Sequence, residues 1–523
     1  MICQKEGLSL SDFIREAKES LVDPGIQGPL PEEPSEINPL PSETTDFLTD
    51  YGNAMALVGK HGCDLRYVYE LGWLVWTDNR WERDTTGSVM RMAMNTVLDL
   101  FDEASKEYDT AHAAIETALQ CAQKGEVVSL DEVLDHLKRA EGRAHKKLSW
   151  AINSQHRSRL EAMVALATNL QPVVAKVGDF DQDPWLLNVT NGTLDLRTGQ
   201  LKAYDRHDLI TKLAPISYDA DAHSDVFDRF LTTITDNDNE LAEYLQRAAG
   251  FSLSGLTTEE VVFLVLGPAA TGKSTYVEML LSAMGDYGLK ASFDTFLEQR
   301  NPGAARPDLA RLPGVRLAIA CESGAGRRLD SVALKELSGG DTITCRTLYH
   351  EQFSFKPQAK IWLATNEAPS MRDDDSGLWR RIRRLPFEHV IPECERDPDV
   401  KIFLTDPKHG GPAVLAWAVQ GCLTWQKHGM GFPNLVRTKT EQLRVEYDPI
   451  ADFITDYCVL KEGVDSRVKE LHSAYMEWAK EAGVNPISGT ALGRRMSVLP
   501  GVTKDRDNRG VFYRGIGLKR LES

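Results

Sequence analysis

The sequence has little of what marks membrane, secreted and zinc-binding proteins. Its apolar runs are all much shorter than the ~20 residues that a helix needs to cross a bilayer. Residues 1–20 carry charges throughout, unlike the apolar core of a signal peptide. Eight cysteines are scattered along the chain without a CxxC pair, which argues against a zinc ribbon or a disulfide framework. We therefore expect a cytoplasmic protein with reduced thiols and no membrane partner.

An excess of basic residues is also absent. The chain has 60 Lys and Arg against 77 Asp and Glu, a formal net charge of −17, so it is not a general nucleic-acid coat. The balance is uneven along the sequence. Residues 1–60 hold 4 basic and 11 acidic residues, net −7, whereas residues 461–523 hold 12 and 8, net +4. Any contact with DNA must come from local basic patches, and the C-terminal region is the first place to expect one.

The length and composition indicate several globular domains. A chain of 523 residues with 42% hydrophobic and 26% charged residues is too long for one ordinary domain and too apolar for disorder. No internal repeat is evident. Composition shifts predict an acidic, proline-rich segment, a helical domain, an α/β domain of alternating strands and helices and a small basic domain, over residues 1–45, 46–225, 226–440 and 441–523.

A phosphate-binding loop is the clearest local motif. It fits the pattern GxxxxGK[ST], with an apolar strand pattern before it and a helical pattern after it. Its backbone N–H groups and the helix N-terminus would face anionic oxygens. Lys273 would reach the β- and γ-phosphates of ATP, and Ser274 would ligate Mg²⁺. The residues assigned to nucleotide binding are Gly267, Pro268, Ala269, Ala270, Thr271, Gly272, Lys273, Ser274 and Thr275.

Two polar residues follow later apolar strand patterns. Glu322 ends the run from Arg316, and it could polarise the attacking water, hold the metal, or both. Asn366 ends the run from Lys360, and its amide could orient water against the γ-phosphate. The order of loop, acid and amide within 100 residues of Gly267 is typical of an ATP-hydrolysing site.

Four arginines then occur within five residues, Arg380, Arg381, Arg383 and Arg384. They could form a stripe that contacts DNA phosphates. Alternatively, one of them could be an arginine finger that reaches the ATP bound by a neighbouring subunit, because a planar guanidinium pairs with phosphate oxygens at two points. A merely solvated cluster is the third interpretation.

Together these motifs resemble the superfamily 3 helicases. The loop at Gly267–Thr275 and the segments LAIACE, LKELSGGDTITCRTLYHEQFSF, KIWLATNEAP and DSGLWRRIRRLPF have the order and spacing of the phage and plasmid primase–helicase branch, which is related to the poxvirus helicase-primase. The segment DPWLLNVTNGTLDLRTGQL resembles the helical N-terminal domain of that branch, and the C-terminal region resembles its winged-helix domain. The likeness covers about residues 46–523.

The resemblance implies a fold and an assembly. The expected fold is a multidomain α/β protein with an AAA+-type P-loop motor, a helical N-terminal collar domain and a C-terminal winged-helix domain. The expected assembly is a homohexameric ring that moves along single-stranded or forked DNA with ATP and Mg²⁺. By position, Ser274 and Glu322 hold the metal, Asn366 is the sensor and Arg381 is the finger, with Arg380 as second choice. Many relatives have two acids where this chain has only Glu322, so the residue that makes the second metal contact is left open here.

The resemblance also implies where DNA binds. The segment Lys335–Phe355 matches the motif that forms a β-hairpin projecting into the central channel, with its tip at Tyr349 and His350. In the C-terminal region, basic residues interleaved with aromatic ones would contact the phosphate backbone. The residues assigned to DNA binding are Lys335, Arg346, Tyr349, His350, Arg494, Arg495 and Arg509.

No primase active site is expected on this chain. Only 45 residues precede the helical domain, too few for a catalytic core. The run Asp179-Phe180-Asp181-Gln182-Asp183 is interpreted as a surface loop and not as a two-metal site. Any priming would come from a separate primase or initiator protein.

The function that the sequence favours is an ATP-dependent replicative DNA helicase serving a phage, prophage or plasmid in a bacterial cytoplasm. Two alternatives remain. One is an ATP-dependent loading factor without processive unwinding, and the other is a DNA-binding initiator whose ATP site only controls its oligomeric state. A pure binding module would not need the acid, sensor and arginine positions to be filled, which favours the helicase.

Overall fold

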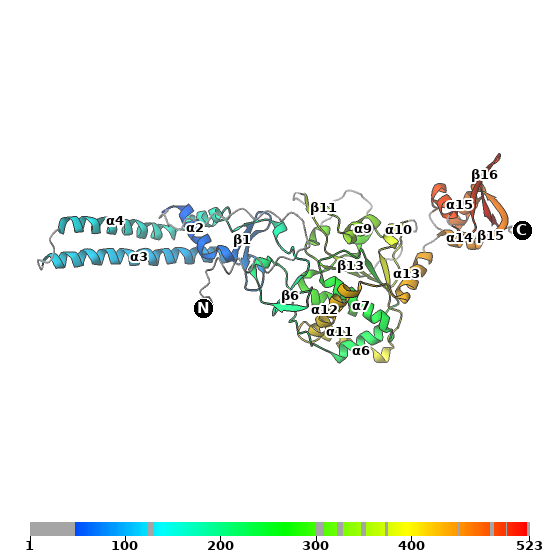
Figure 1. The fold of residues 1–523 in the computed structure, drawn as a ribbon, viewed down its shortest axis with the longest axis horizontal. Coiled ribbons are helices and arrows are strands. Elements are labelled where there is room, and N and C mark those ends of the chain that lie inside the picture. The colour runs from blue at the N-terminus through cyan, green and yellow to red at the C-terminus, as the bar shows by residue number, and fades with distance from the viewer. Residues whose placement is uncertain are drawn as a thin grey trace, which may run out of the picture.

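In a computed structural model, the described residues are 48–123, 130–298, 308–321, 328–346, 352–371, 375–446, 449–481, 486–497 and 499–519. They form a long helical arm, a central α/β body and a small C-terminal domain, arranged in a row (Figure 1). The predicted α/β class with a helical N-terminal region and a parallel sheet is confirmed. The predicted acidic segment 1–45 lies outside the described residues. No helix among those described is long and apolar enough to span a bilayer.

The N-terminal region combines helices with a small sheet. Its helices are α2 (Asp50–His61), α3 (Ser88–Gln123), α4 (Leu130–Ser154) and α5 (Arg157–Ala167). Its sheet has the order β3-β2-β1-β4, formed by Trp81–Arg83, Gly72–Trp76, Leu65–Val68 and Val174–Ala175. Apolar side chains of α2, α3, α5 and the sheet share one core, including Leu57, Val97 and Met163. Beyond this core, α3 and α4 continue as a hairpin that projects from the molecule (Figure 1).

Three antiparallel strands connect this region to the body. They are β5 (Leu186–Val189), β6 (Gly192–Asp195) and β7 (Gln200–Lys202), and a two-residue turn at Thr190 and Asn191 joins the first two. Leu187 and Leu194 are fully buried in the core of the body, together with residues of its helices and its sheet. Residues on both sides of the predicted domain boundary at 225 therefore share one hydrophobic core. The apolar faces of these strands have no core of their own and are covered by the body.

A five-stranded parallel sheet organises the body, in the order β14-β8-β13-β10-β9. These strands are Ile382–Pro386, Val262–Leu266, Lys360–Thr365, Leu317–Cys321 and Gly288–Lys290. Strand β8 is buried on both faces. Phe263 and Val265 face one hydrophobic core, whereas Val262, Leu264 and Leu266 face the other. This alternation is expected of a central strand covered by helices on both sides.

The helices of the body cover both faces of that sheet. The first core includes α6 (Asp225–Ile234), α7 (Asn239–Leu253), α8 (Lys273–Met284), α11 (Pro398–Thr405) and α12 (Gly411–His428). The second includes α9 (Ser331–Gly339) and α10 (Ser376–Trp379). A short hairpin of β11 (Ile343–Arg346) and β12 (Gln352–Phe355) follows α9. Helix α13 (Asn434–Glu446) packs on β14, so in packing the body extends past the predicted boundary at 440.

The C-terminal domain has its own core. Its elements are α14 (Pro449–Tyr457), β15 (Cys458–Arg467), α15 (Val468–Glu481), α16 (Gly489–Met496), β16 (Thr503–Asp507) and β17 (Gly510–Leu518). The strands form an antiparallel sheet in the order β15-β17-β16. Phe453, Tyr475 and Trp478 form an aromatic cluster beneath it, with ring centroids 5.3 to 6.0 Å apart.

The contact between α7 and α12 gives a test of the packing. A Cβ atom on Gly250 would lie 2.0 Å from the backbone nitrogen of Cys422. Because backbone cannot yield as a side-chain end does, we expect Gly250→Ala to lower the stability of the body by about 3 kcal/mol. Gly59→Ala in α2 is the control, since that Cβ would meet nothing within 4 Å. It should raise stability by up to ~1 kcal/mol. Urea denaturation followed by tryptophan fluorescence measures both, and an unchanged midpoint for Gly250→Ala would contradict the packing described.

Candidate nucleotide site

The loop after β8 has a backbone that depends on its glycines. Ala270 and Gly272 have φ angles of 61° and 82°, in the left-handed region where glycine is least strained. A Cβ on Gly272 would also lie 2.5 Å from Cγ2 of Ile234, at the end of α6. A Cβ on Gly267 would lie 1.8 Å from the carbonyl oxygen of Phe387, just after β14. The loop is thus clamped between α6 and the end of β14, in the strand–loop–helix context that the motif predicts.

Lys273 begins α8 and its side chain folds back over the loop. Its Nζ donates to the carbonyl oxygens of Gly267 (2.8 Å) and Pro268 and to Oγ1 of Thr271 (3.2 Å). The residue is 7% exposed, and this burial lowers the pKa of its ammonium group. Ser274 is exposed beside it. A cation, a hydroxyl and the N-terminus of α8 therefore meet at one point, which is an arrangement that suits phosphate oxygens.

The amide predicted as a sensor lies beside this loop. Strand β13 pairs directly with β8, and Thr365 is opposite Leu266. Asn366, the next residue, is exposed at the same edge of the sheet as Gly267. On the far side of β13, Cys321 at the end of β10 is opposite Ala364. The predicted acid Glu322 lies outside the described residues.

The arginine cluster lies where strand β14 begins, at the opposite end of the parallel strands from the phosphate loop. Strand β14 runs parallel to β8, with Ile382 opposite Val262, and the N–H of Val262 donates to the carbonyl oxygen of Arg381 (2.9 Å). The loop starts five residues further along β8, so the backbone at Arg381 and the loop of one subunit are separated by roughly 17 Å at ~3.3 Å per residue. The two candidate fingers, Arg380 and Arg381, therefore lie away from the loop of their own chain.

Within the cluster, the two candidate fingers differ in exposure. Arg380 and Arg381 both donate to Oε2 of Glu260 at 2.8 Å. The side chain of Arg381 is only 9% exposed and also donates to the carbonyl oxygen of Gly377 (2.9 Å). The side chain of Arg380 is 65% exposed. Burial therefore favours Arg380 over Arg381, the first choice from the sequence, as the arginine that can contact another molecule.

The other two arginines are held within the subunit. The guanidinium of Arg383 stacks on the ring of Phe432, 4.5 Å from its centroid. Arg384 pairs with Glu388 (3.3 Å), and its backbone N–H donates to Oγ1 of Thr440 (3.0 Å). These contacts fasten β14 to α13 and to the segment before it. The interpretation of all four arginines as a DNA-binding stripe is therefore not supported.

The hairpin predicted to meet DNA is present, but its tip is not described. Arg346 pairs with Gln352 across the two strands, while Tyr349, His350 and the side chain of Arg346 lie outside the described residues. Lys335 in α9 donates to Oδ2 of Asp375 (2.9 Å). The other carboxylate oxygen of Asp375, Oδ1, accepts the N–H of Leu378, so that Asp375 is the N-cap of α10. Lys335 therefore connects α9 to α10, and this pairing competes with the predicted contact to DNA.

Comparisons with known proteins cover most of this architecture. Residues 54–236 match a family described as D5 N terminal like, residues 265–384 match a family of unknown function (DUF5906), and residues 446–508 match a family described as Poxvirus D5 protein-like. A protein of Acanthamoeba polyphaga mimivirus that is named as a helicase is 31% identical over 331 residues, which is 58% of this chain and 34% of that protein. The chain is therefore similar to poxvirus D5-like proteins in both its N-terminal and its C-terminal regions.

Other relatives of this D5-like protein come from further viruses. Proteins named as helicases from Invertebrate iridescent virus 3 and Frog virus 3 are 27% and 26% identical over 43% and 48% of this chain. They are matched over 26% and 27% of their own length, so the chain spans about a quarter to a third of these relatives. Among solved structures, the apo NrS-1 C terminal region aligns with a TM-score of 0.37 and 13% identity over 58% of this chain and 78% of that one.

The C-terminal domain of the D5-like protein places the predicted basic residues on two elements. Arg494 is exposed and Arg495 half-buried on α16, and Arg509 is exposed in the turn between β16 and β17. Asp507, in the same turn, accepts the N–H of Arg509 (2.8 Å) and both guanidinium nitrogens of Arg467 (2.6 Å each). The hydrogen bonds from Arg467 lower the pKa of Asp507 to about 2. This pair fixes the turn that carries Arg509.

The aspartate run Asp179–Asp183 forms turns. Asp179 accepts the N–H of Lys176 (2.8 Å), Asp181 accepts the N–H of Thr211 (2.9 Å), and Asp183 accepts the N–H of Trp185 (2.9 Å). Each carboxylate is thus oriented by a different backbone segment. This agrees with the sequence interpretation of the run as a loop.

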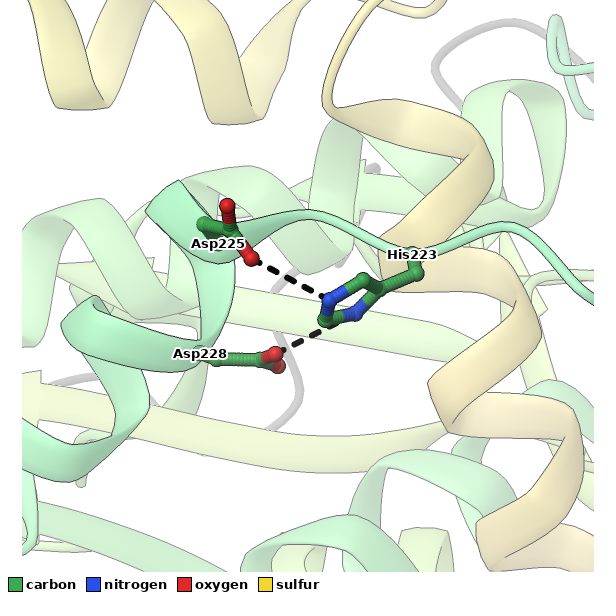
Figure 2. Close-up of side chains that lie close together, drawn as sticks. All are labelled: His223, Asp225 and Asp228. Atoms are coloured by element: carbon green, nitrogen blue, oxygen red, sulfur yellow. Dashed lines mark ion pairs between the residues drawn. The ribbon is translucent and has the colours of Figure 1, made fainter.

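One group of side chains was not singled out in the sequence. His223, Asp225 and Asp228 lie together at the start of α6 (Figure 2). Each ring nitrogen of His223 is 3.2 Å from a carboxylate oxygen, Nε2 from Asp225 and Nδ1 from Asp228. Their spacing would suit a metal ion, but all three are exposed and already pair with one another. We interpret them as a surface ion-pair cluster.

Proposed function

We propose that this protein is an ATP-driven DNA helicase that works as a ring in the replication of a virus-like or plasmid element. One observation carries the proposal. The phosphate-binding loop lies at the carboxyl ends of the parallel strands, and the exposed Arg380 lies at their amino ends. The two therefore do not meet within one chain. A complete ATP site then needs two subunits, which is the principle of a ring motor. The helicase names of the viral relatives support the same function.

In the proposed site, Lys273 exchanges its loop carbonyls for the β- and γ-phosphates of ATP, and Ser274 and Glu322 are the residues that would hold Mg²⁺. The residues present suit a phosphate group, because the ammonium of Lys273, the exposed hydroxyl of Ser274 and the N-terminus of α8 lie at this loop. Asn366 at the same edge orients the attacking water. Arg380 of the neighbouring subunit reaches the γ-phosphate and stabilises the charge of the transition state.

Glu260 has a specific place in this scheme. It holds Arg380 and Arg381 through one oxygen atom, and it lies two residues before β8, the strand that ends at the phosphate loop. The carboxylate therefore keeps the exposed guanidinium in position until the γ-phosphate of a neighbour competes for it. Because one rigid strand carries both the loop and this anchor, the occupancy of one site can influence the arginine offered to the next.

DNA would be contacted by the β11–β12 hairpin and by the C-terminal domain. Three helices and a three-stranded antiparallel sheet ending in a hairpin support the winged-helix prediction for that domain. Arg494 on α16 and Arg509 in the final turn would contact phosphates. We likewise interpret the body as the AAA+-type motor. The competing function, a loading factor or initiator without processive unwinding, would use the same ATP site and is separated from the helicase by strand displacement.

The first test removes the phosphate-binding cation. We expect Lys273→Ala to lose ATP binding and all unwinding of a forked DNA, because no other cation contacts the loop carbonyls among the described residues. Lys290→Ala is the control, since Lys290 is an exposed residue that pairs with Glu278. ATP turnover and displacement of a labelled strand measure both. Unwinding by Lys273→Ala would contradict the helicase proposal, and ATP turnover by the wild type without strand displacement would favour the loading factor.

The second test asks whether the arginine acts between subunits. We expect Arg380→Ala to lower kcat by about 10³-fold while ATP affinity stays within about threefold, because the finger contacts only the transition state in a neighbour's site. Mixed rings of Arg380→Ala and Lys273→Ala should regain turnover, since some interfaces then hold one intact loop and one intact arginine. Arg157→Ala serves as the control, since Arg157 is exposed on α5 and pairs with Glu161 of the same helix. Failure of well-mixed rings to regain any turnover would place Arg380 outside the neighbour's ATP site.

A further inference from the structure

The helical arm carries charges of opposite sign on its two helices. Exposed acidic side chains lie along α3, at Asp102, Glu103, Asp109 and Glu116, with Lys106 as the single cation between them. Exposed cations lie along α4, at Lys138, Arg139, Arg143 and Lys146. None of these four cations pairs with another described residue, in a chain whose formal net charge is −17. Such a stripe of unpaired charge needs a partner or open solvent.

The helical period places these charges on outward faces. Ala104 and Tyr108 of α3, and Ala144 and Leu148 of α4, are shielded from solvent where the helices meet. Asp102 and Asp109 are two and five residues from Ala104, which puts them on the far side of α3. Lys138, Arg139 and Lys146 lie on the far side of α4 by the same count. The arm therefore has an acidic back formed by α3 and a basic back formed by α4.

Two contacts between the helices fix the heights of these charges. Nζ of Lys147 is 3.1 Å from Oε2 of Glu107, and Nδ1 of His112 is 2.6 Å from Oε1 of Glu141. Since the helices are antiparallel, Asp109 is level with about residue 145 and Glu116 with about residue 138. Along the arm, each of these acids therefore stands within about one turn of the basic residues of α4, Asp109 beside Lys146 and Glu116 beside Lys138.

We propose that the arms of neighbouring subunits dock side by side, with the acidic back of one α3 against the basic back of the next α4. The two surfaces are on opposite sides of one arm, so each copy offers one to either neighbour. Such a head-to-tail contact closes into a ring when the rotation allows it. In this proposal the arms run parallel to the ring axis, so that neighbouring arms stand at equal heights and Asp109 meets Lys146 while Glu116 meets Lys138.

A second copy of the chain explains more than DNA does. A DNA phosphate backbone would use the basic back alone and would leave the acidic back without a role. The proposal rests on the ring of the proposed function. Because exposed ion pairs are individually weak and screened by salt, the arms would add to an interface formed by the bodies and would not hold the ring by themselves.

The test reverses the charges of each back in the full-length chain. One variant carries Arg139→Glu and Lys146→Glu, a second carries Asp109→Lys and Glu116→Lys, and a third carries all four changes. Lys408→Glu with Lys427→Glu, two exposed residues of the body, is the matched control. The concentration at which half of the chain is assembled is measured with ATP by analytical ultracentrifugation, in low and in high salt.

We expect each double variant to raise that concentration about tenfold in low salt, and the control to leave it unchanged. The fourfold variant should restore assembly to within about threefold of the wild type, which a misfolded arm could not do. In high salt the differences should disappear. These results together would support docking between arms.

Other outcomes would overturn the proposal. Assembly that ignores all reversals would exclude docking between the arms while leaving the ring itself intact. If only the basic reversal had an effect, and that effect were weaker binding of forked DNA with unchanged assembly, the partner of α4 would be DNA. A wild type that stays monomeric with ATP would overturn both this inference and the proposed ring. A wild type that forms a ring but does not unwind DNA would contradict only the proposed helicase activity.

Discussion

Burial of strand β8 on both faces is the constraint on which the rest of the structure depends. Its five residues contribute alternately to two cores, so the strand can neither shift nor tilt without exposing apolar side chains on one side. Fixing β8 fixes both of its ends. The phosphate loop leaves one end, and Glu260 holds the arginine pair just before the other. The separation of loop and arginine is therefore a property of the core, and it is what makes a site shared by two subunits the natural interpretation.

The parts that the sequence predicted well are those determined by neighbouring residues. The loop between β8 and α8, for example, depends on glycines and a lysine within eight positions. The contacts that it did not reveal depend on distant partners. Lys335 was assigned to DNA, but it meets Asp375, 40 positions along the chain. Arg381 was preferred to Arg380, but Glu260 and the carbonyl of Gly377 bury it. No local pattern reveals such pairings, because they arise only when separate elements pack together.

The same reasoning explains why the strands before residue 225 pack into the core of the body. The strands β5 and β6 read as part of the N-terminal region, but the buried cation Arg316 fastens the start of this segment to the sheet of the body, and the buried cation Lys360 holds that sheet to neighbouring segments of the body. Arg316, which precedes β10, donates to the carbonyl oxygens of Leu253 (2.9 Å) and Leu186 (2.7 Å). Lys360, the first residue of β13, donates to the carbonyl oxygens of Ser254 and Gln358. Burial lowers the pKa of both groups, and neighbouring backbone carbonyls replace the water that each has lost.

These cations also give a physical route between the arm and the body. They lie at the starts of β10 and β13, the strands that end near the phosphate loop, and Arg316 contacts the first residue of β5, which continues from the N-terminal region. A buried cation that satisfies carbonyls of two segments resists their separation, because breaking the contact would leave its charge without partners in a dry interior. Any movement of the sheet during ATP turnover would therefore be passed to β5 and towards the base of the arm, instead of being absorbed by a loose linker.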